Sequence, residues 1–435
     1  MTTTAASSFL QEADGFAERF SGPSVLSDRR REAKEAFGKM GIPSVKHEEW
    51  KYLNLSVLQT TGYRTVSPVA ETKLNATDVK RFRLCGDDAY LCVVENGSFN
   101  AAASAISGLP AGIRIGTLSD LENDPRVQEH LFKLAPYTSE PMVALNTMLC
   151  YDTVIILADP GTKLETPIQL AFVAHADKNP IAIPARVLVL AGDEAELTIM
   201  ESYHSYGEGA STFTNAVTES VIGNAARMHY AKVQVENANA RHIGYHYTQL
   251  HRDSYQHLTT LTLGGSLVRN NLYLRLDGEN INTYLNGLYV AGGEQVVDNH
   301  TLVDHATPHC FSSELYKGII DDKAQGVFNG KIWVRQDAQK TNAYQSNKNI
   351  LLSNDASMNT KPQLEIYADD VKCSHGATTG QLDEEALFYL RARGIGEAAA
   401  RALLNHAFAA DVVEQVENET IRQSLMLLLD VKLSR

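Results

Sequence analysis

The residues best suited to chemistry are Cys373 and His375, which are separated by a single serine. If residues 371–375 are extended, the thiol and the imidazole point to the same face of the strand, whereas on a helix they would lie roughly 200° apart. Thiolates and imidazoles are ligands that iron and iron–sulfur clusters accept. Two ligands leave such a site incomplete, so a metal-binding role for this pair implies an iron or cluster site completed by a partner chain.

A structural role is the alternative for both residues. A cysteine on a strand is often a small buried hydrophobe, and a histidine is often held by internal hydrogen bonds. The spacing alone favours this structural interpretation of Cys373 and His375, and other parts of the sequence must decide.

The cysteines are odd in number and widely scattered, at Cys85, Cys92, Cys150, Cys310 and Cys373. They form no CxxC pair. This pattern is typical of free thiols in a reducing compartment and argues against a self-contained four-cysteine site. Cluster chemistry would therefore need ligands from elsewhere.

A second concentration of polar residues lies in residues 298–310 (DNHTLVDHATPHC). On one strand Asp298, His300 and Asp304 would share a face, and His305 would point the other way. No pair of histidines here has the spacing of a standard zinc site. We expect structural histidines that are hydrogen-bonded to neighbouring coils.

Signatures of a free-standing enzyme are missing from the sequence. It contains no GxxxxGK[ST], HExxH or GxSxG string. Residues 394–399 match GxGxxA, but the residues before them predict a helix, so a helix–helix turn is favoured over a dinucleotide site. We expect a chain that is not itself an enzyme.

Bulk properties exclude further classes. The formal net charge of −13 over 435 residues argues against a nucleic-acid partner. No apolar run approaches the roughly 18 residues that cross a bilayer. Residues 1–11 lack a basic patch followed by an apolar stretch, so we expect no secretory signal, no membrane association and a cytoplasmic location.

The middle of the chain must position any site, and its pattern is that of β-strands. Between about residues 155 and 367, short runs alternate apolar and polar positions, which buries one face of each strand. Turn-like strings begin at residues 192, 223, 277, 292, 321, 336 and 353, mostly about 15 residues or twice that apart. This spacing favours a β-solenoid over a β-sandwich. Polar residues 342–349 are expected to form an inward Asn/Gln ladder between coils.

Helical patterns flank this body. Residues 29–40 are good helix formers, and Asp383 and Asn418 are suited to cap helices after the β region. We therefore predict three regions: a mainly helical residues 1–88, a β region with the solenoid core in residues 89–367, and a helical residues 368–435.

These strings resemble one family, the SufB/SufD proteins of iron–sulfur cluster assembly. The matching segments are EEWKY (48–52), VDH (303–305), ELYKG (314–318), VFNGKI (327–332), QKTNAYQSNKN (339–349) and PQLEIYADDVKCSH (362–375). The resemblance covers nearly the whole chain. Within the family the sequence is similar to the SufD type, because it lacks the N-terminal cysteine motif common in SufB-like members.

The resemblance implies a right-handed parallel β-helix with helical ends. It implies pairing with a SufB-like paralogue, and docking of a SufC-like ABC-type ATPase on the C-terminal helices. His375 matches a histidine at the interface between the paralogues, where a transient iron–sulfur cluster or iron is shared, and Cys373 matches the cysteine beside it. The resemblance strengthens the ligand interpretation of His375 more than that of Cys373. A flavin in the assembled complex and a homodimer of the isolated chain stay open.

The implied function is that of a non-catalytic scaffold subunit, with ATP hydrolysis performed by the partner. One alternative is a scaffold that recruits the ATPase but ligates nothing. Another is a β-helix carbohydrate-active enzyme, for which the converging carboxylates and a secretion signal are not evident.

Overall fold

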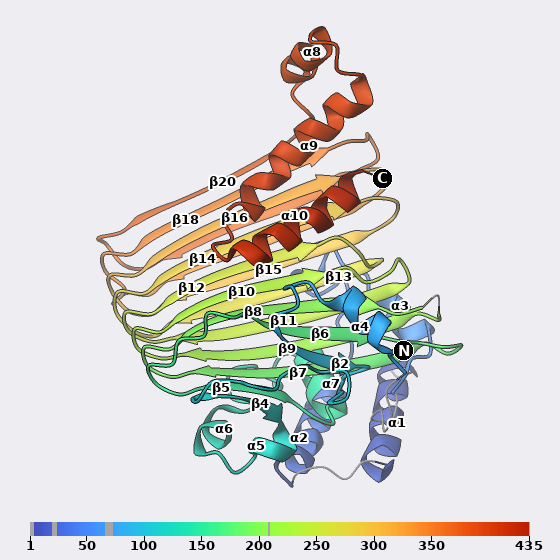
Figure 1. Ribbon diagram of the computed structural model, residues 1–435, viewed down its shortest axis with the longest axis vertical. Helices are drawn as coiled ribbons and strands as arrows, with labels where there is room; N and C mark the ends of the chain where they lie inside the picture. The colour runs from blue at the N-terminus through green and yellow to red at the C-terminus, as the bar shows by residue number, and fades with distance from the viewer. Residues whose placement is uncertain (1–3, 20–23, 66–72, 208, 435) are drawn as a thin grey trace.

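The computed structural model (Figure 1) describes residues 4–19, 24–65, 73–207 and 209–434. Residues 1–3, 20–23 and 66–72 of the predicted helical region 1–88 lie outside the described residues. Residues 1–3 also belong to the segment 1–11, for which no secretory signal is predicted. Within the described parts, no helix is both long and apolar enough to cross a lipid bilayer.

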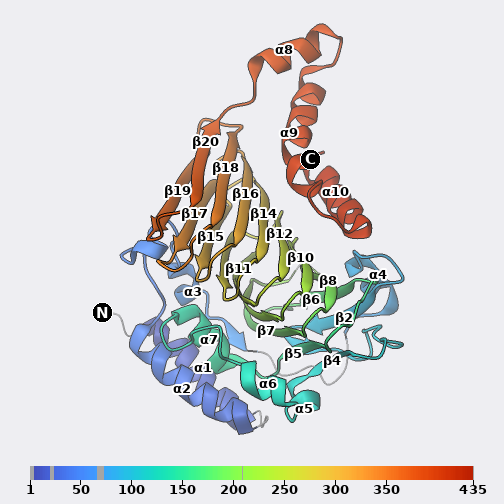
Figure 2. The same ribbon diagram turned by 90° about the vertical axis from the view of Figure 1, so that its left-hand side faces the viewer.

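Two ten-stranded sheets, here called sheet A and sheet B, form the body of the molecule. The chain passes from one sheet to the other at almost every turn, so each coil adds one strand to each sheet (Figures 1 and 2). Within each sheet neighbouring strands are parallel, except for β4 with β5 and β2 with β3. This is the predicted parallel β-solenoid.

In spatial order sheet A contains β19 (Ser357–Ile366), β17 (Gln325–Val334), β15 (Val296–His305), β13 (Leu267–Leu276), β11 (Ala240–Leu250), β9 (Thr212–Ile222), β7 (Ile181–Ala191), β5 (Val154–Ala158) and β4 (Ile113–Thr117), with β1 (Arg64–Thr65) beside β7. Sheet B contains β20 (Lys372–Gly380), β18 (Asn342–Leu351), β16 (Phe311–Ile320), β14 (Asn282–Ala291), β12 (Tyr255–Thr262), β10 (Arg227–Gln234), β8 (Glu196–Ser205), β6 (Ile168–Ala174), β2 (Tyr90–Glu95) and β3 (Ser98–Phe99).

The turns predicted from the sequence lie at corners of the coils. Five of them hold a residue with positive φ, at Glu194, Ala225, Asn280, Gly293 and Asp322. The left-handed conformation reverses the chain within a few residues. Several turns end on an alanine that is buried inside the solenoid: Ala195, Ala226, Ala324 and Ala356.

Three polar residues of segment 342–349 point inward, but their register partners on the neighbouring coils are not Asn or Gln, so the expected Asn/Gln ladder between coils is not formed. Gln345, Asn347 and Asn349 are buried, while Tyr344 just before them and Lys348 between Asn347 and Asn349 are exposed. The Gln345 side chain donates a 2.7 Å hydrogen bond to Glu314 on the coil below, 31 residues earlier in the sequence. Asn349 donates to Asn347 at 2.7 Å. Such bonds satisfy polar groups inside the solenoid.

The N-terminal part covers the outer face of sheet A with α7, which packs between α2 and strands β7 and β9 (Figure 2). Trp50 is buried. The helices of this part are α1 (Thr4–Arg19), α2 (Ser24–Met40), the 3₁₀ turn Glu48–Trp50, α3 (Ser56–Thr60), α4 (Ala76–Phe82), α5 (Leu118–Leu121), α6 (Pro125–His130) and α7 (Pro141–Leu149).

The C-terminal part contains α8 (Glu384–Ala392), α9 (Glu397–Val413) and α10 (Glu419–Leu433). The predicted caps are present: Asp383 accepts hydrogen bonds from the first turn of α8, and Asn418 accepts one from Ile421 in α10. Helix α9 contacts β14 and β16, while α8 projects past the last coil (Figures 1 and 2).

The predicted boundary at residue 367 does not coincide with the end of the solenoid. Strand β20 begins at Lys372 and pairs with β18, and the first C-terminal helix begins only at Glu384. The reason is that residues 372–380 satisfy their backbone groups by adding a last strand to sheet B.

Candidate functional site

Cys373 and His375 both lie on β20, the last strand of sheet B, at the open end of the solenoid (Figure 2). Their partners in the pairing register are Ala343 and Gln345, both buried inside the solenoid. The two residues therefore face the interior side of the sheet together, as the extended spacing predicted. No further coil covers them, so His375 is exposed and Cys373 is half-buried.

The thiol of Cys373 rests on an apolar cluster at the end of the solenoid, formed by Ile332, Val334, Ala338, Ala343 and Ala368. Burial raises the pKa of this thiol above its usual value. The thiol is protonated at neutral pH as a consequence. A nearby cation or a metal ion would be needed to convert it into a thiolate ligand.

The imidazole of His375 has no hydrogen-bonding partner among the described residues. Within the described part of the chain, no hydrogen bond or ion pair engages its ring. Below it in the same column of side chains lie Gln345 and then the buried Glu314. Burial raises the pKa of Glu314 to about 7. An imidazole without internal partners can bind a metal or a partner chain without first breaking an internal contact.

The rim of the open end has free strand edges and two exposed apolar side chains among polar ones. Ile366 and Tyr367 are exposed there, with 61% of Tyr367 accessible. Strands β19 and β20 are each last in their sheet, so each presents an unpaired row of backbone groups. Free edges beside exposed apolar side chains are typical of a surface that another protein covers.

Comparison with known proteins decides the family. Residues 172–408 match the family described as SUF system FeS cluster assembly, SufBD core domain, and residues 8–170 match the SufBD protein N-terminal region. The chain belongs to the SufBD family. The resemblance found in the sequence strings is thereby confirmed, and the family is one of iron–sulfur cluster assembly.

Curated SufBD relatives align over most of the chain. An iron–sulfur cluster assembly SufBD family protein of Synechocystis sp. is 33% identical over 406 residues, which cover 90% of this chain and 88% of that protein. The iron–sulfur cluster assembly protein SufD of Escherichia coli is 31% identical over 397 residues, covering 91% and 90%. The SufD protein of Bacillus subtilis is 27% identical over 315 residues, covering 72% and 71%.

The polar segment 298–310 of this SufBD chain holds its N-terminal part in place. Asp298 and His300 share the outer face of β15, as expected, with His300 Nε2 3.0 Å from Asp298 Oδ1. Arg269 pairs with Asp298 at 3.0 Å, stacks on the Trp50 ring and donates to the Glu49 carbonyl.

The other members of that segment are dispersed. Asp304 accepts two hydrogen bonds from Arg335, and His305 points inward to Ser312 at 2.9 Å. The structural interpretation of residues 298–310 agrees with these contacts.

Buried charges inside the solenoid were missed by the sequence analysis. Glu201 accepts hydrogen bonds from Tyr203 at 2.5 Å and Thr218 at 2.8 Å. Burial opposes its ionisation, but Lys232 and His246 keep the pKa of Glu201 below its usual value. The sequence did contain a signal for this burial, because Glu201 follows Leu197 and Ile199 at intervals of two and therefore points inward with them. These buried charges are compensated by partners and have a structural role.

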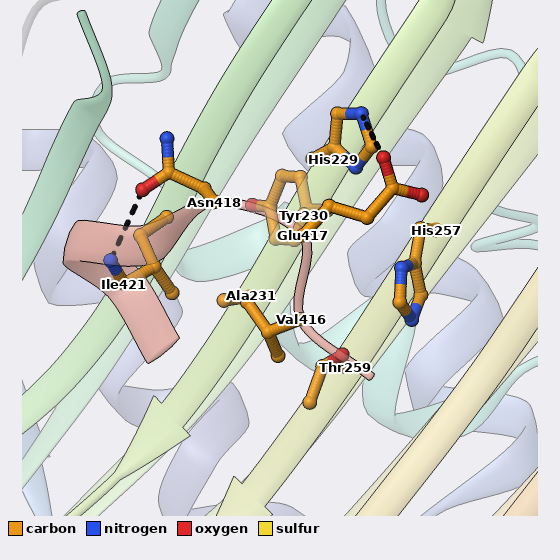
Figure 3. Close-up of a pocket in the computed structure, with 9 residues that line it drawn as sticks. All are labelled: His229, Tyr230, Ala231, His257, Thr259, Val416, Glu417, Asn418 and Ile421. Atoms are coloured by element: carbon orange, nitrogen blue, oxygen red, sulfur yellow. Dashed lines mark hydrogen bonds and ion pairs between the residues drawn. The ribbon is translucent and has the colours of Figure 1, made fainter. Parts of the chain in front are cut away.

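The sequence analysis also missed a group of His229, His257 and Glu417 on the outer face of sheet B (Figure 3). The two histidines are one coil apart in the sequence, and their positions on neighbouring strands can be recognised only when the length of a coil is known. The glutamate comes from the turn before α10, far away in the sequence. No local pattern brings these three residues together.

Proposed function

We propose that this chain is a SufD-type, non-catalytic scaffold subunit of a cytoplasmic iron–sulfur cluster assembly complex. In the proposal, the open end of the solenoid pairs with a SufB-like paralogue, and the C-terminal helices dock a SufC-like ABC-type ATPase. The nascent cluster is cargo, held between the two solenoids and ligated on this side by His375, with Cys373 as a second donor. Five free cysteines agree with a reducing compartment.

The observation that carries the proposal is the state of His375. It is exposed at the uncovered end of a solenoid, beside two free strand edges, and no hydrogen bond or ion pair from the residues that the structure describes uses its ring. Other polar groups of the same inward columns are buried and bonded, as Gln345 and Glu314 are. An open end with unpaired strand edges is a template for pairing with another chain, so a partner surface is expected there.

The C-terminal helices supply a second surface. Phe388, Tyr389 and Leu403 are exposed on α8 and α9, with 75% of Phe388 accessible. Such exposed apolar side chains support a docking role for these helices.

Helix α9 is mechanically tied to the solenoid. Lys317 of β16 donates a 2.9 Å hydrogen bond to the Phe408 carbonyl and pairs with Asp411, both in α9. The ammonium group is almost fully buried and lies 4.4 Å from the Phe408 ring centroid. Movement of the ATPase-bound helices would therefore pull on β16, which is connected to β20 through β18.

The test is anaerobic reconstitution of the complex with iron and sulfide, using wild-type chain, His375→Ala and Ser374→Ala. Ser374 is exposed on the same strand but faces the other side, which makes it a matched control. We expect His375→Ala to form the complex normally and to lose most of the cluster signal in absorption and Mössbauer spectra. Ser374→Ala should behave as wild type.

Full cluster formation by His375→Ala would contradict the ligand role. If the complex still contained both partners, that result would favour a scaffold that recruits the ATPase and ligates nothing. Cys373→Ser, measured in parallel, decides whether the half-buried thiol is a second ligand: unchanged spectra would assign it to packing alone.

A further inference from the structure

His229 and His257 lie side by side on the outer face of sheet B. They are direct partners in the register of β10 and β12, and their ring centroids are 6.3 Å apart. The residues that flank His229, Met228 and Tyr230, point inward and are fully buried. Because adjacent parallel strands are about 4.8 Å apart, two such imidazoles can reach one ion.

Glu417 completes the group from above. It lies in the turn between α9 and α10, and its carboxylate points toward both histidines (Figure 3). His229 Nε2 and Glu417 Oε2 are 3.7 Å apart, and one ligand atom from each of the three residues lies within 4.8 Å of the others.

These separations are close to those of a coordinated ion. Bonds of about 2.0–2.1 Å in a tetrahedral site hold ligand atoms about 3.3–3.4 Å apart. Closing the present arrangement needs shifts of up to about 1.4 Å between ligand atoms, shared between the half-exposed Glu417 side chain and the two histidines.

Hydrogen bonds from neighbouring residues orient His257 and Glu417. Asn286 Nδ2 lies 2.8 Å from His257 Nε2, which leaves Nδ1 as the nitrogen available to a metal. Tyr255 donates a 2.5 Å hydrogen bond to Glu417 Oε1 and leaves Oε2 facing His229. A second contact to each ligand is what metal-binding histidines and carboxylates generally have.

The surroundings also suit a metal site. His229 Nδ1 is buried and has no hydrogen-bond partner. Burial lowers the pKa of His229, and that of His257 to about 4, so both imidazoles are neutral at physiological pH, as metal ligands must be. Ala231, Val416 and Ile421 form an apolar wall beside the group (Figure 3).

We propose that His229, His257 and Glu417 bind a divalent first-row transition-metal ion that fastens the α9–α10 turn to sheet B. Two imidazoles and one carboxylate suit Zn²⁺ and Fe²⁺, and leave at least one position for water. Because the ligands come from the solenoid and from the C-terminal helices, binding of the ion stabilises their contact. The site is separate from His375 and does not depend on the function proposed above.

The test uses the full-length chain carrying Cys373→Ser and His375→Ala, so that the open end of the solenoid contributes no binding. After chelation, Co²⁺ is titrated as a spectroscopic probe, followed by competition with Zn²⁺ and, anaerobically, with Fe²⁺. We expect one equivalent of Co²⁺ with the strong visible absorption of a low-coordinate site. The competition shows which of the two ions the site prefers.

Variants locate the site. Glu417→Gln and His257→Gln should each weaken Co²⁺ binding at least about tenfold, and Asn286→Ala should weaken it by about 10–100-fold. Glu414→Gln, an exposed carboxylate at the end of α9, should have no effect. Hydrogen exchange of residues 397–433 should slow when metal binds, and only when Glu417 is intact.

Two results would overturn the proposal. One is the lack of stoichiometric Co²⁺ binding by the parent chain. The other is unchanged binding in both Glu417→Gln and His257→Gln. Glu417→Gln changes a half-exposed side chain and keeps its hydrogen bond from Tyr255, so loss of the fold would not explain a negative result; thermal unfolding of each variant checks this directly.

Discussion

At the scale of single residues, the interior of the solenoid modifies the chemistry of the groups that it encloses. Glu314 is buried below His375 and Gln345, and burial raises its pKa to about 7 from an ordinary value of 4.5. In the folded protein this carboxyl stays protonated at pH values where the unfolded chain has already ionised it. Folding is therefore linked to pH through Glu314.

The raised pKa of Glu314 predicts that the free energy of unfolding falls as the pH rises from about 4.5 to 7. In this window the unfolded chain releases a proton that the folded chain retains, so rising pH favours unfolding; above pH 7 both states are ionised and the effect levels off. The total is up to about 3 kcal/mol at 1.36 kcal/mol per pKa unit. In Glu314→Gln this contribution disappears.

Urea unfolding of wild type and Glu314→Gln at pH 5 and pH 8 measures the effect. The variant should gain stability relative to wild type between these two pH values. A constant difference would mean that Glu314 is already ionised in the folded protein at pH 5. Glu279→Gln, an exposed carboxylate, serves as the control.

At the scale of elements, one buried ion pair joins the N-terminal part to sheet A. Arg186 of β7 and Glu219 of β9 lie 2.5 Å apart with no exposed side-chain surface. The carboxylate also accepts hydrogen bonds from the backbone of Leu134 and Ala135. The guanidinium reaches Thr147 of α7 at 3.0 Å. Both charges are thus paired and hydrogen-bonded, as buried charges must be.

Removal of one partner should be strongly destabilising. Glu219→Ala leaves the Arg186 guanidinium buried without a counter-charge, and we expect a loss of about 3–5 kcal/mol in the free energy of unfolding. Replacing both residues by apolar ones of similar size, as in Arg186→Met with Glu219→Leu, should cost less than Glu219→Ala alone.

Chemical denaturation gives these values, and limited proteolysis within residues 125–149 reports local detachment. A loss below about 1 kcal/mol in Glu219→Ala would show that water reaches the pair and that it does not hold this part in place.

At the scale of the whole molecule, the two proposed partner surfaces lie on different elements. Tyr367 is exposed directly after β19, and Phe388 is exposed on α8. Helix α8 projects beyond the last coil (Figure 2). Both side chains contribute little to the packing of the chain itself. Each is therefore available for a substitution that affects one partner and not the other.

Charged substitutions at these positions should separate the two interactions. Tyr367→Asp is expected to reduce co-purification of a SufB-like paralogue at least tenfold and to leave ATPase capture intact, because it replaces an exposed aromatic side chain of the rim with a charge. Phe388→Asp should have the opposite pattern. Pull-downs with each partner, together with the melting temperature of each variant, measure this. If Tyr367→Asp left capture of the paralogue unchanged, the paralogue would have to bind elsewhere.

Much of the solenoid was determined by local sequence. Alternation with a period of two fixes which side chains face inward, and turn strings at regular spacing fix where the coils bend, because both depend on neighbouring residues only. The inward series Gln345, Asn347 and Asn349 and the caps Asp383 and Asn418 follow from the same local rules. The sequence also predicted that Cys373 and His375 lie on the same face, since residues two apart on a strand share a side.

Tertiary structure alone decided the rest. Whether His375 is covered depends on the absence of another coil above β20, and the segment that forms β20 was assigned to the helical end because its pairing partner is a full coil away. Glu417 meets His229 and His257 only because α9 and α10 fold back over sheet B. Such contacts arise from packing between distant segments, and their residues have no spacing that could be read along the chain.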